Sequence, residues 1–83
     1  MEYEKIFRQT EKIFKEVLDN QNIKIKENTT QNDIEEWDSL TYIQLIDAIE
    51  KEFDIQFYSN EIGKWKNVGA ICKSIEEKLQ NNH

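Results

Sequence analysis

The first segment of the chain shows apolar residues at the three- and four-residue spacing of an amphipathic α-helix. Its inward positions are Tyr3, Ile6, Phe7, Thr10, Ile13, Phe14, Val17 and Leu18. Lysine and arginine side chains stand between them, as on the solvent face of such a helix. The pattern predicts a helix of roughly five turns over residues 2–19. We expect it to end at Asn20-Gln21-Asn22, because asparagine tolerates left-handed cap geometry.

No helical period is present between Asn20 and Trp37, so this stretch is expected to form a long loop. Within it, Ile23-Lys24-Ile25-Lys26 alternates like a β-strand, but no second segment offers a pairing partner. We therefore expect a loop whose isoleucines plug the core. A structureless connection of this length is unusual in a compact domain and is often functional.

A second helix is predicted over residues 39–53, with two different stripes. The core stripe consists of Tyr42, Leu45, Ile46, Ile49 and Phe53. The opposite stripe consists of Leu40, Ile43, Asp47, Glu50 and Asp54. Single exposed apolar residues are common, but two aliphatic side chains together beside Ser39 indicate a surface that another protein contacts.

Two further helices are predicted over residues 59–64 and 67–79. In the short one Ile62 faces the core and Gly63 permits a tight exit. Asn67 is the expected N-cap of the last helix. Its apolar stripe consists of Val68, Ile71, Cys72, Ile75 and Leu79. Without repeats or a linker, residues 1–83 are expected to form a single all-α domain, a four-helix bundle with three longer helices and one short helix.

The composition excludes several kinds of site and partner. A single cysteine excludes a disulfide framework and a cysteine-rich zinc site. The net charge of −6 argues against binding to nucleic acid and to anionic membranes, both of which need a basic surface. No apolar run approaches a membrane span, and Met1-Glu2-Tyr3-Glu4 lacks the basic start of a signal peptide. We expect a cytoplasmic monomer.

The inventory of reactive side chains argues against an enzyme. Cys72 lies on an apolar stripe, where a buried thiol is inert, and His83 is the terminal residue. No Ser–His pair, Cys–His pair or metal-ligand cluster is available. A calcium loop starting at Asn28 would need glycine where Asp33 stands, and one starting at Asp33 would use Trp37 as a ligand. We therefore expect no metal site.

What is left is the start of the second helix, at Asp38-Ser39-Leu40. Asp-Ser at a helix start is by itself an ordinary cap. However, backbone N–H groups and the helix dipole favour a negative group here, so a phosphate ester on Ser39 would be stabilised. Acidic residues surround it, which suits docking to basic partners. They are Asp33, Glu35, Glu36, Asp38, Asp47, Glu50, Glu52 and Asp54.

These residues carry a family resemblance. The run that begins Asp38-Ser39-Leu40 and continues through Ile43, Leu45, Ile46, Ala48, Ile49, Glu50 and Glu52-Phe53-Asp54 resembles the acyl carrier proteins. Almost the whole chain follows the family's order of helix, long loop, Asp-Ser-Leu helix, short helix and final helix.

The resemblance implies both a cofactor and partners. A phosphopantetheinyl transferase would attach 4′-phosphopantetheine from coenzyme A to Ser39, which is flanked by Asp38 and Leu40. Acyl groups would then be carried as thioesters on this phosphopantetheine arm. Acyl-loading, condensing or transferase enzymes with basic docking patches would bind to the second helix. The residues that map to this partner surface are Leu40, Ile43, Asp47 and Glu50.

The chain departs from carriers of central fatty-acid synthesis at three positions. Glu36 replaces a usual glycine, Trp37 replaces a small residue, and Asp47 stands where an apolar side chain is common. These differences favour a stand-alone carrier of a specialised pathway. A peptidyl or aminoacyl carrier would use the same serine, and a non-enzymatic helical adaptor would use Asp38-Ser39 only as a cap. The sequence leaves the cargo and the pathway open.

Overall fold

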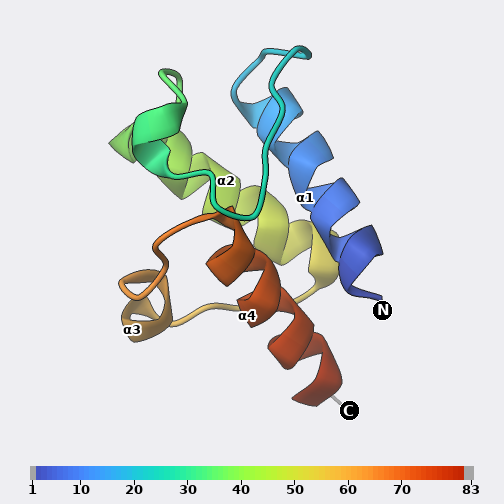
Figure 1. Ribbon diagram of the computed structural model, residues 1–83. Coiled ribbons are helices and arrows are strands. Elements are labelled where there is room, and N and C mark those ends of the chain that lie inside the picture. Colours follow the sequence, from blue (N-terminus) through green and yellow to red (C-terminus); the bar gives the residue numbers. More distant parts are fainter. Residues whose placement is uncertain (1, 82–83) are drawn as a thin grey trace.

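The computed structural model describes residues 2–81 and contains four α-helices (Figure 1). Their bounds are α1 Tyr3–Val17, α2 Ser39–Phe53, α3 Ser59–Ile62 and α4 Val68–Asn81. Figure 1 shows the three long helices packed together, with the short α3 set to one side, to the left of α4 in this view. Residues 2–81 contain no β-strand, so the fold is the all-α four-helix bundle expected from the sequence.

The core is formed by the apolar stripes of the three long helices. Ile6 and Phe14 of α1, Leu45 of α2 and Ile75 of α4 are almost completely buried. Burying these stripes against one another removes apolar surface from water, which is the main force that holds so short a chain together. Tyr42 of α2 is only half-buried and packs against the edge of this core.

The long loop between α1 and α2 contributes to the core without forming a strand. Ile23 and Ile25 are buried, as the alternating pattern suggested for a loop that plugs the core. The loop then crosses the beginning of α4 (Figure 1). There the carbonyl oxygen of Glu27 accepts a hydrogen bond from the Gly69 amide at 2.8 Å, and that of Thr29 accepts one from the Val68 amide at 2.9 Å. The loop therefore caps a helix that is distant in sequence.

Several local expectations need correction. The left-handed residue after α1 is Asp19, with φ of 53°, rather than one of the following asparagines. α3 ends at Ile62 instead of residue 64, and Gly63 has an ordinary helical φ of −65°, so its exit needs no glycine. The loop also contains a 3₁₀ turn, η1 (Gln31–Asp33), that was not predicted. Its signal was a Thr-x-x-Asp capping box, in which the Thr30 amide donates to Asp33 Oδ2 at 2.8 Å.

Candidate functional site

Ser39 is the first residue of α2 and is exposed. The helix begins here because Asp38 and Thr41 form a reciprocal cap. Asp38 Oδ1 accepts from the Thr41 amide at 2.9 Å, and Thr41 Oγ1 accepts from the Asp38 amide at 2.8 Å. The cap therefore belongs to the residues on either side of Ser39, and its own hydroxyl is not part of that cap.

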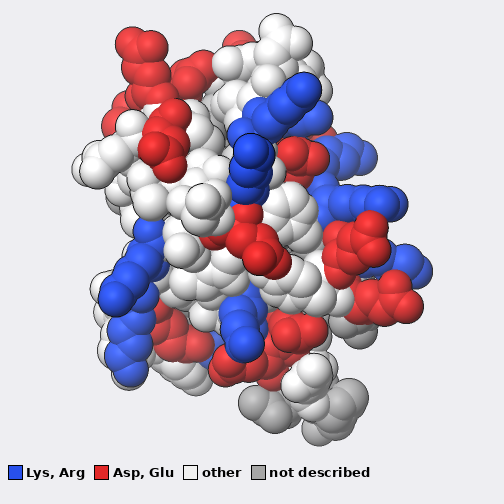
Figure 2. Space-filling view, viewed as in Figure 1, with Lys and Arg blue, Asp and Glu red and all other residues white. Residues whose placement is uncertain are grey.

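The electrostatic setting of Ser39 combines a helix N-terminus with ionised carboxylates. The backbone N–H groups at the start of α2 favour a negative group. Hydrogen bonding, first of all from the Thr41 amide, lowers the pKa of Asp38. The pKa of Glu36 is lowered mainly because Asn20 donates to its carboxylate at 2.8 Å. In Figure 2 acidic side chains gather over the region of η1 and the start of α2. The negatively charged surface around Ser39 therefore favours a positively charged partner.

The four positions expected to contact partners have different surroundings. Leu40 and Ile43 are each 66% exposed, on the outer face of the first turns of α2. Asp47 is exposed and forms an ion pair with Lys51 at 3.0 Å. Glu50 is only half-exposed, and its Oε2 accepts a hydrogen bond from the Phe57 amide at 2.8 Å. The carboxylate of Glu50 therefore already holds the loop between α2 and α3.

Trp37 and Tyr42, on either side of Ser39 in the sequence, belong to a group of packed aromatic rings that sequence reasoning did not assemble. Trp37 is 5% exposed and packs edge-on against Phe14, with ring centroids 5.0 Å apart, and against Tyr42 at 5.7 Å. Tyr42 in turn lies 6.5 Å from Trp65, which precedes α4. The large side chain at position 37 is thus an anchor that ties the start of α2 to α1.

The remaining reactive groups of residues 2–81 do not form a second chemical site. Burial raises the pKa of the Cys72 thiol to about 11, and the side chain is completely buried, as its position on an apolar stripe indicated. His83 lies outside the described residues. Within residues 2–81 no cluster of histidine, cysteine and acidic side chains has the arrangement of a metal site. Over the same range no helix is long and apolar enough to span a membrane.

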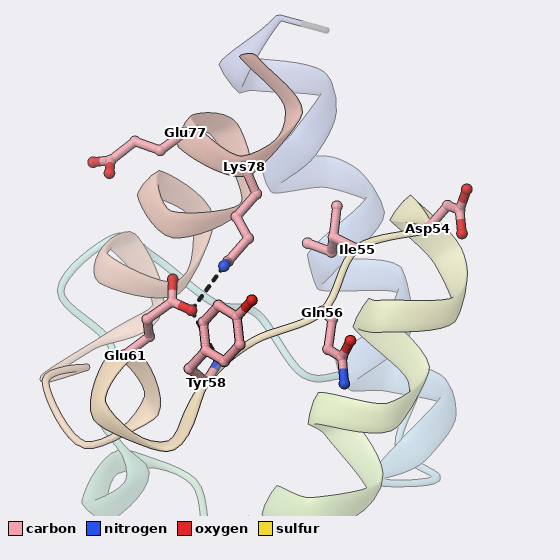
Figure 3. Close-up of a pocket in the computed structure, with 7 residues that line it drawn as sticks. All are labelled: Asp54, Ile55, Gln56, Tyr58, Glu61, Glu77 and Lys78. Carbon is pink, nitrogen blue, oxygen red and sulfur yellow. Dashed lines mark hydrogen bonds and ion pairs between the residues drawn. The ribbon is translucent and has the colours of Figure 1, made fainter. Parts of the chain in front are cut away.

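A broad surface hollow of about 570 Å³ lies at the other end of α2 (Figure 3). Inside it Lys78 Nζ lies 2.7 Å from Glu61 Oε1 and 4.7 Å from the ring centroid of Tyr58. Asp54, which borders the hollow, is separated from Ser39 by the 15 residues of α2, or about 22 Å. This hollow is therefore separate from the surface around Ser39.

Comparison with known proteins gives a family model and a solved structure that are similar to this chain. The family model described as "Phosphopantetheine attachment site" matches residues 9–75. The fold is also similar to the solution NMR structure of a holo acyl carrier protein from Geobacter metallireducens, with a TM-score of 0.86. The two sequences are 34% identical over a match covering 92% of this chain and 87% of the other. No curated protein matches the sequence.

Proposed function

Because this chain belongs to the acyl carrier protein family, we propose that Ser39 is the residue to which its 4′-phosphopantetheine arm is attached. The proposal rests on one observation, which is that the Ser39 side chain is exposed and takes no part in the helix cap. It is exposed at the first position of α2, while Asp38 and Thr41 make the cap. Esterification of Ser39 therefore removes no hydrogen bond of the cap, and the helix N-terminus stabilises the phosphate that is added.

The other two serines fit the arm less well. Ser74 Oγ accepts a hydrogen bond from the Trp65 indole at 2.8 Å and is half-buried. Ser59 is exposed, but it opens a helix of only four residues, whose dipole is correspondingly weak. Ser39 alone stands in the Asp-Ser-Leu context of the family.

The arm supplies a terminal thiol on which acyl groups are carried as thioesters. The chain's own thiol cannot take this role, because Cys72 is buried and its pKa is about 11. Acyl carrier proteins are generally non-catalytic, and we assign no catalytic residue to this chain. Its residues hold the arm at the end of a rigid helix and present a surface to the enzymes that act on the cargo.

Acyl carrier proteins interact with modifying and biosynthetic enzymes. For this chain we propose a phosphopantetheinyl transferase and acyl-loading, condensing or transferase enzymes with basic docking patches. The contact surface consists of Leu40, Ile43 and Asp47, which lie exposed along α2 from Ser39. Glu50 adds negative charge, but its carboxylate holds the loop after α2. A single domain over residues 1–83, working as a cytoplasmic monomer, is part of the same proposal.

The proposal is tested by measuring whether phosphopantetheine is attached to the chain, and at which residue. The purified chain is incubated with coenzyme A and a broad-specificity transferase, and the intact mass is measured before and after. We expect one phosphopantetheine per chain, located on Ser39 by tandem mass spectrometry. Ser39→Ala is expected to accept none, whereas the matched variant Ser59→Ala loads normally.

Circular dichroism must accompany the mass measurement. Because the Ser39 hydroxyl is outside the cap, Ser39→Ala is expected to stay folded, within about 0.5 kcal/mol of the parent. An adduct on Ser59 or Ser74, or loading of a folded Ser39→Ala variant, would refute the assignment.

A further inference from the structure

Glu36 connects the end of α1 to the segment that precedes Ser39. It lies in an exposed turn before α2, and its Oε2 accepts a hydrogen bond from Asn20 Nδ2 at 2.8 Å. The two residues are 16 positions apart in the chain, so this bond joins the two ends of the long loop between α1 and α2. The glycine usual at this position in carriers of central fatty-acid synthesis has no side chain with which to form it.

The Asn20 end of this bond is fixed on α1. Asp19 is in the left-handed conformation, and the Asn20 amide donates to the Lys15 carbonyl oxygen at 3.0 Å, which closes the last turn of the helix. Asn20 Oδ1 accepts from the Asn22 amide at 3.0 Å. This second bond orients the side-chain amide and leaves its NH₂ group for Glu36.

The Glu36 end is bonded to the cap of α2. The Glu36 carbonyl oxygen accepts from Thr41 Oγ1 at 2.8 Å, and the same Thr41 oxygen accepts from the Asp38 amide. Hydrogen bonds therefore run from Asn20 through Glu36 to Thr41, that is, from the end of α1 to the first turn of α2. Ser39 lies in the segment between Glu36 and Thr41.

The turn that contains Glu36 has few other restraints. Ile34 and Trp37 on either side are buried, but the turn itself consists of the exposed residues Glu35 and Glu36. Within residues 2–81 neither of these two carboxylates forms an ion pair. Segments with few buried contacts open locally at low cost in free energy. The bond to Asn20 is therefore the contact that holds this turn against α1.

Attachment of the arm depends on the orientation of Ser39. The reaction forms a bond from Ser39 Oγ to the phosphorus that carries pantetheine, breaks the bond from that phosphorus to the adenine nucleotide of coenzyme A, and passes the serine proton to a base of the transferase. The reacting atoms must be aligned, and a displacement of about 1 Å lowers the rate.

We propose that the Asn20–Glu36 hydrogen bond is a positioning contact for this attachment, which holds the turn before α2 so that Ser39 reaches the transferase in one orientation. This inference rests on the proposed attachment at Ser39. It gives Glu36 two separable roles. As a hydrogen-bond acceptor it positions Ser39, and as a negative charge it attracts the transferase.

The test measures loading in a single turnover, with the transferase in excess and coenzyme A saturating, and follows the intact mass of the chain over time. The maximal rate reports how Ser39 is oriented in the complex. The transferase concentration that gives half of this rate reports docking. The two roles of Glu36 therefore appear in different parameters.

Asn20→Ala should lower the maximal rate roughly two- to tenfold, the range for one lost hydrogen bond, and leave the half-saturating concentration unchanged because no charge is removed. Glu36→Gln keeps an acceptor for Asn20, so it should retain the maximal rate and raise the half-saturating concentration. Asn22→Ala, the same change at an exposed position two residues from Asn20, should alter neither.

Two further variants isolate the bond itself. Asn20→Asp keeps an oxygen for the Asn22 amide but cannot donate to Glu36, so it should also lower the maximal rate. The double variant Asn20→Ala, Glu36→Ala should be no slower at saturation than Glu36→Ala alone, because both changes remove the same bond.

A second readout needs no transferase. In ¹⁵N relaxation measurements on the unloaded chain, the backbone amides from Glu36 to Ser39 should have lower order parameters in Asn20→Ala than in the parent or in Asn22→Ala. Circular dichroism establishes that each variant is folded. If Asn20→Ala loses helix, Glu36→Ala removes the same bond from an exposed turn.

Two results would overturn the inference. One is a folded Asn20→Ala variant with the maximal rate and the amide order parameters of the parent. The other is a maximal rate that falls equally in Glu36→Gln and Glu36→Ala, which would assign the effect to charge alone. A parent chain that is not loaded at Ser39 would instead overturn the proposed function.

Discussion

Gly69→Ala is expected to destabilise the protein, even though alanine is the better helix former. Gly69 lies in the first turn of α4, where the loop from α1 to α2 crosses closely. A methyl group added to Gly69 would lie 2.9 Å from the Glu27 carbonyl oxygen and 3.2 Å from its Cβ. Ordinary contacts of this kind begin near 3.4 Å, so either the loop or the helix must move.

Two effects of opposite sign decide the magnitude. Replacing glycine by alanine in a helix interior gains about 1 kcal/mol at most. Against this, an extra methyl group forced into a packed contact costs about 1–3 kcal/mol. The displaced atom is also the acceptor of the 2.8 Å hydrogen bond from Gly69, whose loss costs about 0.5–1.5 kcal/mol. Together these terms give a net loss of about 0.5–3.5 kcal/mol, and the middle of that range, about 2 kcal/mol, corresponds to roughly 8–16 °C in Tm.

The assay is thermal and urea unfolding followed by helical circular dichroism, with Gly63→Ala as the matched control. Gly63 has a φ of −65°, and the nearest atom to an added methyl group, the Ser59 carbonyl oxygen, is 3.6 Å away. The control should therefore be neutral or up to about 1 kcal/mol more stable. If Gly69→Ala is as stable as the parent, the contact between the loop and α4 is loose enough to accept a methyl group, and the reasoning is wrong.

Three further predictions concern Glu50, Cys72 and the docking surface. Glu50→Ala should lower the free energy of unfolding in urea by about 1–2 kcal/mol, because the Phe57 amide loses a charged acceptor. Asp47→Ala, which removes only an exposed ion pair, should change it by no more than about 0.5 kcal/mol, and equal effects would contradict this. Since the Cys72 pKa rises from 9.0 to about 11 on folding, its contribution to stability is complete below pH 9 and is lost as pH approaches 11. The unfolding midpoint of the parent should therefore fall over that range more than that of Cys72→Ala, and parallel curves would refute it. Asp47→Lys should weaken binding of the transferase without unfolding the chain. Added salt should weaken binding of the parent, because charges are screened beyond about 10 Å at 0.1 M salt. An affinity that is unchanged by both would exclude an electrostatic interface.

Features that depend on local pattern can be predicted from the amino-acid sequence. The apolar period of each stretch is enough to predict the helices and their buried faces, because a helix places residues three and four apart on one side. The same reasoning predicted that Ile23 and Ile25 fill the core from a loop and that Cys72 is buried. Ser39 was selected from its Asp-Ser-Leu context and from the chemistry of a helix start.

Contacts between residues far apart in the chain could not be predicted in this way and were established by the folded structure. It assigned the cap of α2 to Asp38 and Thr41, leaving Ser39 outside it, and it engaged Glu50 with the Phe57 amide. It also brought Trp37, Tyr42 and Trp65 together around one cavity and set the loop against Gly69. Helical periodicity reports which face of a segment is buried, but not which atoms of another segment meet it. Those contacts are fixed only when the whole chain packs, since each hydrogen bond and ring contact needs both partners in position.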